Sequence, residues 1–219
     1  GPHTLKVIST DAQGNATESD PATFKIDTVA PTLPTLVGNL TAALPYNTIN
    51  NAEAQALTLT GTAEVGSKVE LVVSNGATVV QTFTIATNLA NANWSLPLTP
   101  AQVSALGQGT FGFVVRSTDT AGNITAASSL NVVIDTVAPT TPVLTRPIAK
   151  DNIINATERT EGVQLTGTLE AGTTAEVILA KVGGTSTTFS STSTPAVSVT
   201  GSTWTLTLDA TAVNNLTNG

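Results

Sequence analysis

Carboxylate and amide side chains recur along the chain, and their spacing is the feature of the sequence that could do chemistry. Asp11 and Asn15 lie in a D-x-x-G-N motif that returns at Asp119 and Asn123. Oxygen ligands supplied by loops are those that calcium prefers, whereas zinc and copper select nitrogen and sulfur ligands. The motif therefore predicts calcium, with magnesium as second choice because it demands stricter octahedral geometry.

Two further repeated motifs extend this set of candidate ligands. Asp27 and Asp135 begin the two copies of D-T-V-A-P, and the motif I-N-x-x-E occurs at residues 49–53 and 154–158. Asp and Asn also cap tight turns, which is the usual explanation for a lone Asp. We favour calcium because three acidic positions recur together. The predicted calcium ligands are Asp11, Asn15, Asp27, Asn50, Glu53, Asp119, Asn123, Asp135, Asn155 and Glu158.

Catalytic constellations are missing from the sequence. His3 is the only histidine and there is no cysteine, so neither a Ser–His–Asp nor a Cys–His arrangement is available. No glycine-rich phosphate loop and no pair of carboxylates typical of a catalytic cleft stands out. Trp94 and Trp204 occupy equivalent positions in the repeat and are predicted to be core residues rather than ligand-stacking ones. We therefore expect no enzyme within these residues.

The elements that position the candidate ligands follow from period-two alternation of apolar residues. About seven short strands per repeat, separated by turns and containing one buried Trp, predict an all-β fold of tandem immunoglobulin-like β-sandwiches in a linear array. A short helical turn is expected at residues 100–106. The residues predicted to face the core are Leu57, Leu59, Val69, Leu71, Val73, Phe83, Ile85, Trp94, Leu96, Leu98, Phe111, Phe113, Val115, Leu130, Val132 and Ile134.

The repeat divides the chain into three segments. Residues 28–135 form one complete repeat, residues 1–27 match only the last two strands of a repeat, and residues 136–219 match a repeat without those two strands. A sandwich lacking two strands would expose an apolar groove and an unpaired sheet edge. Either the end segments fold poorly, or residues 1–27 of one molecule complete the sandwich of another by strand donation, giving head-to-tail chains.

Immunoglobulin topology predicts which ligands meet. The last strand of a domain ends near the loop that precedes its second strand, so Asp135 should meet Asn50 and Glu53 of its own repeat. It should also meet the D-x-x-G-N loop of the following repeat, which here only Asp11 and Asn15 of a neighbouring molecule could supply. The D-x-x-G-N hairpin lies at the opposite end of the domain and faces the preceding linker. Asp27 should therefore meet Asp119 and Asn123. A divalent cation would relieve the repulsion between these carboxylates.

The other repeated acidic residues have simpler interpretations. Glu64 and Glu170 precede glycine in a tight turn and are expected to be turn residues. Glu70 and Glu176 alternate with core residues along a strand and are expected to lie on a solvated face.

Composition limits the partners. The net charge of −7 disfavours nucleic acid and anionic membranes, which select basic patches, and it suits cations. No apolar run reaches the roughly 18 residues of a membrane span, and no signal peptide is visible. Absence of cysteine does not place the protein in the cytosol, because a repeat of this size can hold a core without disulfides.

The phrases STDTAGN, VVIDTVAPTTPVL and LTLTGTAEVGSKVEL resemble the bacterial Ig-like extender repeats of giant Gram-negative adhesins. The resemblance implies type I secretion, a cell-surface location, and calcium at the domain junctions. The junction ligands of that family match Asp11, Asn15, Asp27, Asp119, Asn123 and Asp135. In that family, the loop before the second strand supplies calcium ligands less uniformly. The resemblance therefore gives weaker support to a ligand role for Asn50, Glu53, Asn155 and Glu158.

The function expected from these observations is mechanical. The chain would be a segment of an extracellular stalk, stiffened by calcium at its joints, that projects an adhesive domain and has neighbouring repeats as partners. Two alternatives remain open: a ligand- or carbohydrate-binding Ig-like module, and a spacer domain of a secreted polysaccharide-active enzyme.

Overall fold

The computed structural model describes residues 1–38, 41–43, 46–180 and 184–215 of the 219-residue chain. The chain divides into two compact units, residues 1–137 (unit 1) and residues 138–219 (unit 2). Both consist mainly of short strands, which confirms the predicted all-β class. No helix among the described residues is long and apolar enough to cross a membrane.

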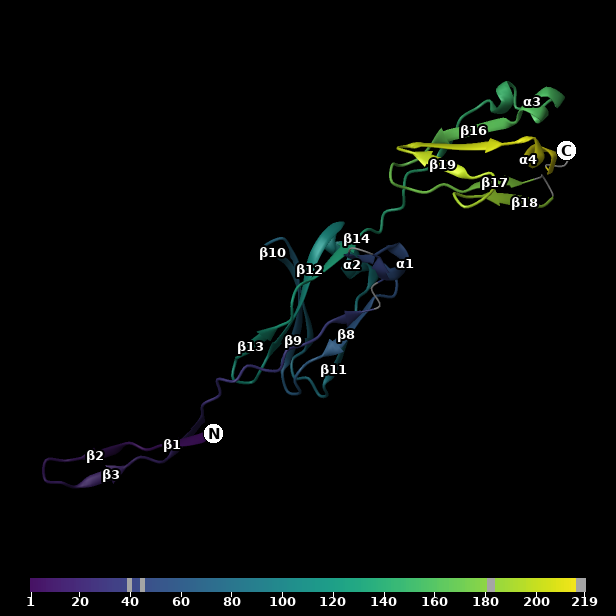
Figure 1. Ribbon diagram of the computed structural model, residues 1–219. Helices are drawn as coiled ribbons and strands as arrows, with labels where there is room; N and C mark the ends of the chain where they lie inside the picture. The colour runs from purple at the N-terminus through teal and green to yellow at the C-terminus, as the bar shows by residue number, and fades with distance from the viewer. Residues whose placement is uncertain (39–40, 44–45, 181–183, 216–219) are drawn as a thin grey trace. The chain divides into compact units, whose positions relative to one another are not determined.

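Unit 1 begins with four exposed strands that pair among themselves (Figure 1). Strand β1 (Pro2–Leu5) pairs with β4 (Ala22–Lys25), and β2 (Ile8–Thr10) pairs with β3 (Ala16–Glu18), both antiparallel. We call residues 1–27 the N-terminal hairpin. Its loop holds the first copy of the D-x-x-G-N motif.

The rest of unit 1 is a two-layered sandwich (Figure 1). The larger layer runs in the order β10 (Thr78–Ala86), β9 (Lys68–Asn75), β12 (Gly109–Thr118), β14 (Leu130–Ile134), β7 (Tyr46–Ile49), β6 (Thr41–Ala43), with β13 (Ile124–Ala126) also paired to β12. The smaller layer contains β11 (Asn93–Pro97), β8 (Thr58–Thr62) and β5 (Val37–Gly38). Two helices complete the unit, α1 (Asn51–Ala54) and α2 (Pro100–Leu106). Helix α2 has the predicted bounds.

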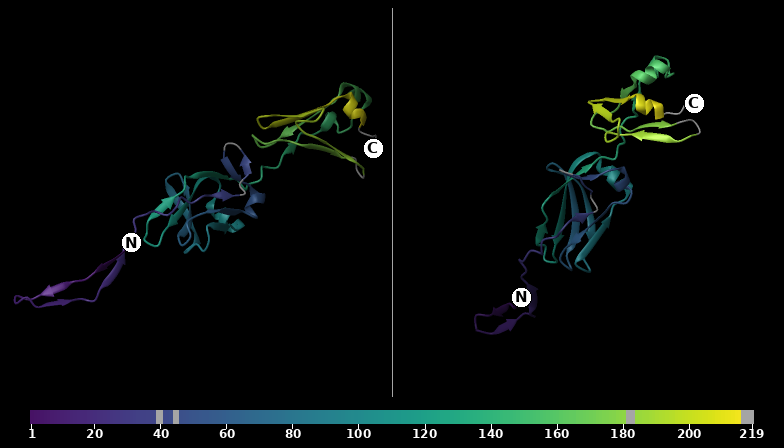
Figure 2. Two further views of the ribbon diagram at one scale, coloured as in Figure 1. Left: turned by 60° about the horizontal axis from the view of Figure 1, so that its bottom comes forward. Right: turned by 45° about the vertical axis from the view of Figure 1, so that its right-hand side comes forward.

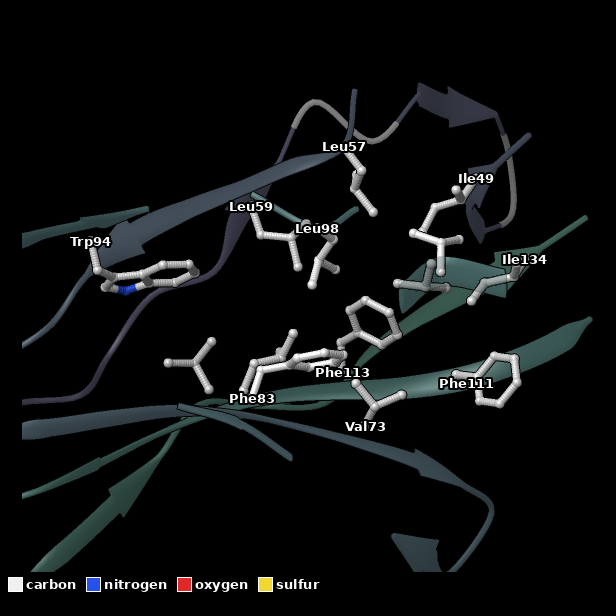
Figure 3. Packing of buried hydrophobic residues seen from close by; sticks show 14 of the residues in the cluster. Ile49, Leu57, Leu59, Val73, Phe83, Trp94, Leu98, Phe111, Phe113 and Ile134 are labelled. Atoms are coloured by element: carbon white, nitrogen blue, oxygen red, sulfur yellow. The ribbon is translucent and has the colours of Figure 1, made fainter. Parts of the chain in front are cut away.

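The core of unit 1 lies between these two layers. Figure 3 shows Leu59 and Trp94 of the smaller layer opposite Phe83 and Phe113 of the larger one. The core-facing residues predicted from alternation are all buried, except that Ile85, Leu96 and Leu130 are partly buried. The prediction that Trp94 and Trp204 are core residues is also confirmed.

A glycine lets the chain that enters each sandwich approach it closely. A Cβ on Gly61 of β8 would lie 2.0 Å from the Thr35 carbonyl oxygen and 2.5 Å from the Trp94 ring. The repeat reproduces this at Gly167, where a Cβ would lie 1.9 Å from the Val143 carbonyl oxygen. Only glycine fits at a position of such close approach.

Unit 2 has the same two-layered plan with fewer strands. One sheet runs β15 (Val143–Leu144), β16 (Val163–Thr168), β20 (Thr203–Leu208), β19 (Val197–Thr200), and the other is the pair β17 (Val177–Ala180) and β18 (Ser186–Phe189). Figure 2 shows the green β17–β18 pair as a layer separate from the yellow strands β19 and β20. The short helices are η1 (Ile148–Lys150), α3 (Ala156–Glu161) and α4 (Ala210–Asn215).

The expectation for Glu70 is wrong, although the one for Glu176 is right. Glu70 is only 6% exposed, because Lys68 and Arg116 cover its carboxylate with contacts of 2.6 and 2.7 Å. The hydrogen bond from Lys68, followed by that from Arg116, holds the pKa of Glu70 below its usual value. Glu176 is exposed. The repeated strand position is therefore a buried glutamate paired with two partly exposed cations in unit 1, and a solvated glutamate in unit 2.

Candidate metal site at the linker

Each D-x-x-G-N motif forms a self-contained turn closed by its own aspartate. The Asp119 carboxylate accepts hydrogen bonds from the backbone N–H groups of Ala121 and Asn123, both at 2.8 Å, and from Asn123 Nδ2 at 2.8 Å. The amide of Asn123 is the main reason why the pKa of Asp119 is lowered. Gly122 takes a positive φ of 93°, which glycine adopts without strain.

The first copy of the motif has the same geometry. Asp11 accepts hydrogen bonds from the backbone N–H groups of Gln13 and Asn15 and from Asn15 Nδ2, and the Asn15 side chain is the main cause of its lowered pKa. The turn-capping role of these aspartates is therefore real in both copies. It leaves their remaining lone pairs available for a further ligand.

The second copy also holds the linker. Asn123 Nδ2 donates to the Asp27 carbonyl oxygen at 3.2 Å, and Thr125 Oγ1 donates to the Pro31 carbonyl oxygen at 2.7 Å. Asp27 thus lies beside Asn123 and its neighbour Asp119, as the topology argument expected. We call residues 27–35 the entry linker, because they lead from the N-terminal hairpin into the sandwich.

A glutamate fixes the other side of the entry linker. Glu64 Oε2 accepts a hydrogen bond from the Thr32 backbone N–H at 2.8 Å. Unit 2 repeats this contact, with Glu170 Oε2 accepting from the Thr140 N–H at 2.9 Å. These glutamates are therefore more than turn residues, since each anchors the chain that enters its sandwich.

Asp27, Glu64 and Asp119 line one cavity of ≈ 360 Å³ together with Lys25. Lys25 Nζ lies 2.7 Å from Asp27 Oδ2. This hydrogen bond is the largest cause of the lowered pKa of Asp27 and of the raised pKa of Lys25. The nearby charge of Asp119 acts on Asp27 in the opposite direction, because two carboxylates repel. Three carboxylates and one ammonium group therefore line the same cavity, and the ammonium group of Lys25 is paired with Asp27.

Asp135 lies at the other end of the sandwich, where the chain leaves it. Its backbone N–H donates to the Ile49 carbonyl oxygen at 3.0 Å, which places Asp135 beside the residue preceding Asn50. Its carboxylate accepts from the Val137 N–H at 3.2 Å. The next residue is held by Gln108, which exchanges two hydrogen bonds with Thr136, at 2.8 and 2.9 Å.

The I-N-x-x-E motifs are helix caps. In α1 the Asn50 side chain accepts from the Glu53 N–H at 2.9 Å, and the Glu53 side chain accepts from the Asn50 N–H at 2.8 Å. Asn155 and Glu158 cap α3 in the same reciprocal way. This capping box satisfies backbone donors that the first turn of a helix leaves unpaired. A role of these four residues in calcium binding stays a prediction.

The described part of the chain contains no group of three or more His, Cys, Asp or Glu side chains close enough to hold a metal ion. Among the described residues, the cavity lined by Asp27 and Asp119 comes closest to such a site. Its side chains offer carboxylate oxygens, which are the type of ligand that calcium prefers. Protein oxygens from two carboxylates alone fall short of the 6–8 ligands that calcium takes, so waters or backbone oxygens would have to complete the shell.

Three residues at the linkers were not singled out from the sequence as functional. Lys25 and Gln108 have no repeated counterpart with the same side chain among the residues aligned with them, so the repeat gave no signal. Glu64 did give one, because it recurs as Glu170, but a glutamate before glycine also suits a turn.

Residues 41–136 match the bacterial Ig-like domain family. Among solved structures, the chain is similar to a Ca²⁺-stabilised adhesin with which an Antarctic bacterium binds ice, with 23% identity over 98% of this chain and 50% of that chain and a TM-score of 0.38. It is also similar to a 1.5-MDa bacterial ice-binding adhesin, with 20% identity over 96% of this chain and 64% of that chain and a TM-score of 0.39. The chain therefore spans about half of the first structure and less than two thirds of the second. A comparison with curated protein sequences gives no match.

Proposed function

Residues 41–136 match the bacterial Ig-like domain family, and from this match we propose that the chain is an extender segment of a cell-surface adhesin. Its role is to space and orient a distal adhesive domain outside the cell. Residues 1–27, 28–135 and 136–219 are then portions of three successive repeats, whose partners are the neighbouring repeats. The proposal assigns no catalytic role to these residues.

The observation that carries this proposal is the repeated anchoring of the linkers. In unit 1 the entry linker is held by the side chains of Glu64 and Asn123, which lie in loops, and of Thr125, which lies in β13. The glutamate anchor recurs in unit 2 at Glu170. Side chains that tie a linker to the domain it enters restrict bending there, and a proline in the linker restricts it further. A mechanical spacer needs this property, whereas a freely jointed array does not.

Calcium strengthens the joint in this proposal. Asp27 and Asp119 would hold the ion, with Asn123 as an amide ligand, and the ion would relieve the repulsion between the two carboxylates. Asp11 and Asn15 would serve the linker that enters their own repeat, and Asp135 the linker that leaves unit 1. Because the ion binds the folded state, it adds stability as RT ln(1 + [L]/Kd). Millimolar affinity suffices outside the cell, and low cytosolic calcium leaves the chain flexible for export.

Two measurements with a matched pair of variants test the proposal. Calorimetric titration counts the calcium ions bound, and small-angle scattering with and without chelator measures flexibility. Asp119→Asn should lose the site at the entry linker. Asp11→Asn, which alters the same turn at a loop that no described linker contacts, should retain that site at concentrations where the chain is monomeric. Scattering that is unchanged by chelator would contradict the stiffening role, and equal losses in both variants would contradict the location.

The strand-donation hypothesis is a separate part of the proposed function. We propose that Ig-like units are partners both along one chain and between molecules, the latter through residues 1–27.

A further inference from the structure

The entry linker is hydrogen-bonded to the sandwich at both ends of one peptide group. Thr125 Oγ1 donates to the Pro31 carbonyl oxygen at 2.7 Å. Glu64 Oε2 accepts from the Thr32 backbone N–H at 2.8 Å. That carbonyl and that N–H belong to the same planar peptide unit. Holding both ends of a rigid plane fixes its orientation as well as its position, and the direction of the linker with it.

The two side chains that hold this peptide come from separate parts of the sandwich. Glu64 lies in the loop between β8 and β9, whereas Thr125 lies in β13. Thr125 is paired with Ser117 of β12 in the β12–β13 ladder. The peptide can be held in one orientation only if the loop of Glu64 and the strand of Thr125 keep a constant spacing.

A buried pair of serines joins these two elements. Ser117 Oγ donates to Ser67 Oγ at 2.8 Å, and Ser67 Oγ donates to the Glu64 carbonyl oxygen at 2.6 Å. Ser117 is 0% exposed and Ser67 is 1% exposed, so water does not compete for these hydrogen bonds. Together with the held peptide they close a ring, which we call the linker ring. It runs through Glu64, Thr32, Pro31, Thr125, Ser117 and Ser67.

The hydroxyl groups of the linker ring recur at the equivalent positions of the other repeats. Ser9 is paired with Thr17 in the β2–β3 ladder, in the register of the serine and threonine of β12 and β13. In unit 2 Thr173 Oγ1 donates to the Glu170 carbonyl oxygen at 2.7 Å. The carboxylate of the same Glu170 accepts from the Thr140 N–H. The arrangement is therefore a feature of the repeat and not of one loop.

We propose that Ser67 and Ser117 are positioning residues for the entry linker, which make Glu64 and Thr125 hold it as one unit. The hydroxyls of both serines bond to other members of the linker ring and act on the linker through them. Hydrogen bonds that share members in a buried network reinforce one another, whereas two independent anchors open separately. The inference rests on the proposed stalk function, to which it adds a means of fixing the linker without calcium.

Replacing one serine differs physically from replacing both, and this difference separates positioning from simple stabilisation. Ser67→Ala leaves the Ser117 hydroxyl buried without its acceptor, which lowers global stability. The double variant Ser67→Ala/Ser117→Ala removes both hydroxyls, and replacing both partners of a hydrogen bond by apolar groups can be nearly neutral. The double variant should therefore regain stability, although the link between Glu64 and β12 stays broken.

Hydrogen exchange of the Thr32 amide, followed by NMR on the full chain with chelator present, tests the proposal at the held peptide. Ser67→Ala should accelerate this exchange by about three- to tenfold, the effect of losing one hydrogen bond. The double variant should exchange as fast as Ser67→Ala, although its thermal midpoint lies closer to that of the unaltered chain. Ser117→Ala should also accelerate exchange, because it removes only the connection to β12.

Ser74→Ala is the matched control. Ser74 Oγ of β9 donates to the Gly112 carbonyl oxygen of β12 at 3.4 Å, so it joins the same two strands at the end of β9 away from Ser67. This variant should leave the exchange of the Thr32 amide unchanged. An equal acceleration in Ser74→Ala and Ser67→Ala would overturn the proposal.

A double-mutant cycle tests whether the two anchors act as one unit. Thr125→Val removes the hydrogen bond to Pro31, and its effect on Thr32 exchange should be less than additive with that of Ser67→Ala, because opening the ring at one link already loosens the rest. Additive effects, or Thr32 exchange that follows the thermal midpoint through all variants, would overturn the proposal. Because chelator is present, these outcomes are independent of calcium binding, so either proposal can fail without the other.

Discussion

Replacing Gly61 with alanine tests how the entry linker is joined to the sandwich. Gly61 lies in β8, opposite Trp94 of β11 and beneath the Thr35 carbonyl oxygen. An added Cβ would stand 2.0 Å from that oxygen and 2.5 Å from the tryptophan ring. Neither contact is tolerable, so either the chain at Thr35 or the indole must move.

The cost should lie at the upper end of the range for overpacked sites. Such substitutions typically destabilise by about 1–3 kcal/mol. Because the closest atom belongs to the backbone, no side-chain rotation relieves the contact, and we expect about 3 kcal/mol. The displaced segment would lose the bond from the Thr35 N–H to the Thr62 carbonyl oxygen and the short pairing of β5 with β8. The entry linker would then be longer and freer.

Urea unfolding measures the loss of stability, and amide exchange at Thr35 and Val37 measures local detachment. A loss of about 3 kcal/mol would lower the thermal midpoint of the unit by about 12 °C or more. Gly112→Ala is the matched control, because the Cβ there would meet mainly the movable hydroxyls of Ser129 and Ser74. If Gly61→Ala destabilised the unit no more than Gly112→Ala, the close approach would not limit this position and the reasoning would be refuted.

Two further substitutions probe charge. Glu70→Gln should lower stability by about 1–3 kcal/mol, less than for a fully buried pair because Lys68 and Arg116 are partly exposed, while Glu176→Gln should change it by less than about 0.5 kcal/mol. Folding lowers the pKa of Glu70, so the contribution of this carboxylate to the free energy of unfolding is complete above the ordinary pKa of 4.5 and is lost as pH falls through the lowered pKa. Acid unfolding of the Gln variant should lack this pH dependence. Parallel acid unfolding curves of the two proteins would contradict the prediction. Lys25→Val should raise the calcium affinity of the entry linker, measured by calorimetry, because it removes the ammonium group paired with Asp27. The control is Lys6→Val, which removes a hairpin lysine that is paired with Glu18 away from the cavity. A similar rise in this control would mean that only the change in net charge matters.

The strands could be predicted from the sequence because both layers of the sandwich are amphipathic. Alternation at Val69, Leu71 and Val73 gives the inner face of β9 whatever the neighbouring strands are. The burial of Glu70 on the outer face of the same strand could not be predicted in this way. It depends on Arg116, which the sheet brings to Glu70 from a strand far along the chain.

The candidate site was only partly accessible from the sequence. The repeat and immunoglobulin topology bring Asp27 to Asn123, and the structure has that contact. The pairing of Gln108 with Thr136 depends on side-chain reach across two segments and leaves no local pattern. The capping box at Asn50 and Glu53 does leave one, since an N-cap residue followed three positions later by glutamate is a helix-start signature.

The entry and exit linkers of unit 1 differ in a way that bears on the proposed stalk. Lys25, two positions before Asp27, forms an ion pair with that aspartate, whereas the residue two positions before Asp135 is Val133. A calcium ion at the entry linker must therefore compete with an ammonium group already bonded to the same carboxylate. At Asp135 no such lysine precedes the aspartate. If calcium stiffens both joints, the exit joint should respond at lower calcium concentration. The calcium sensitivity of such a stalk would then be set separately at each joint by the residue two positions before the D-T-V-A-P motif.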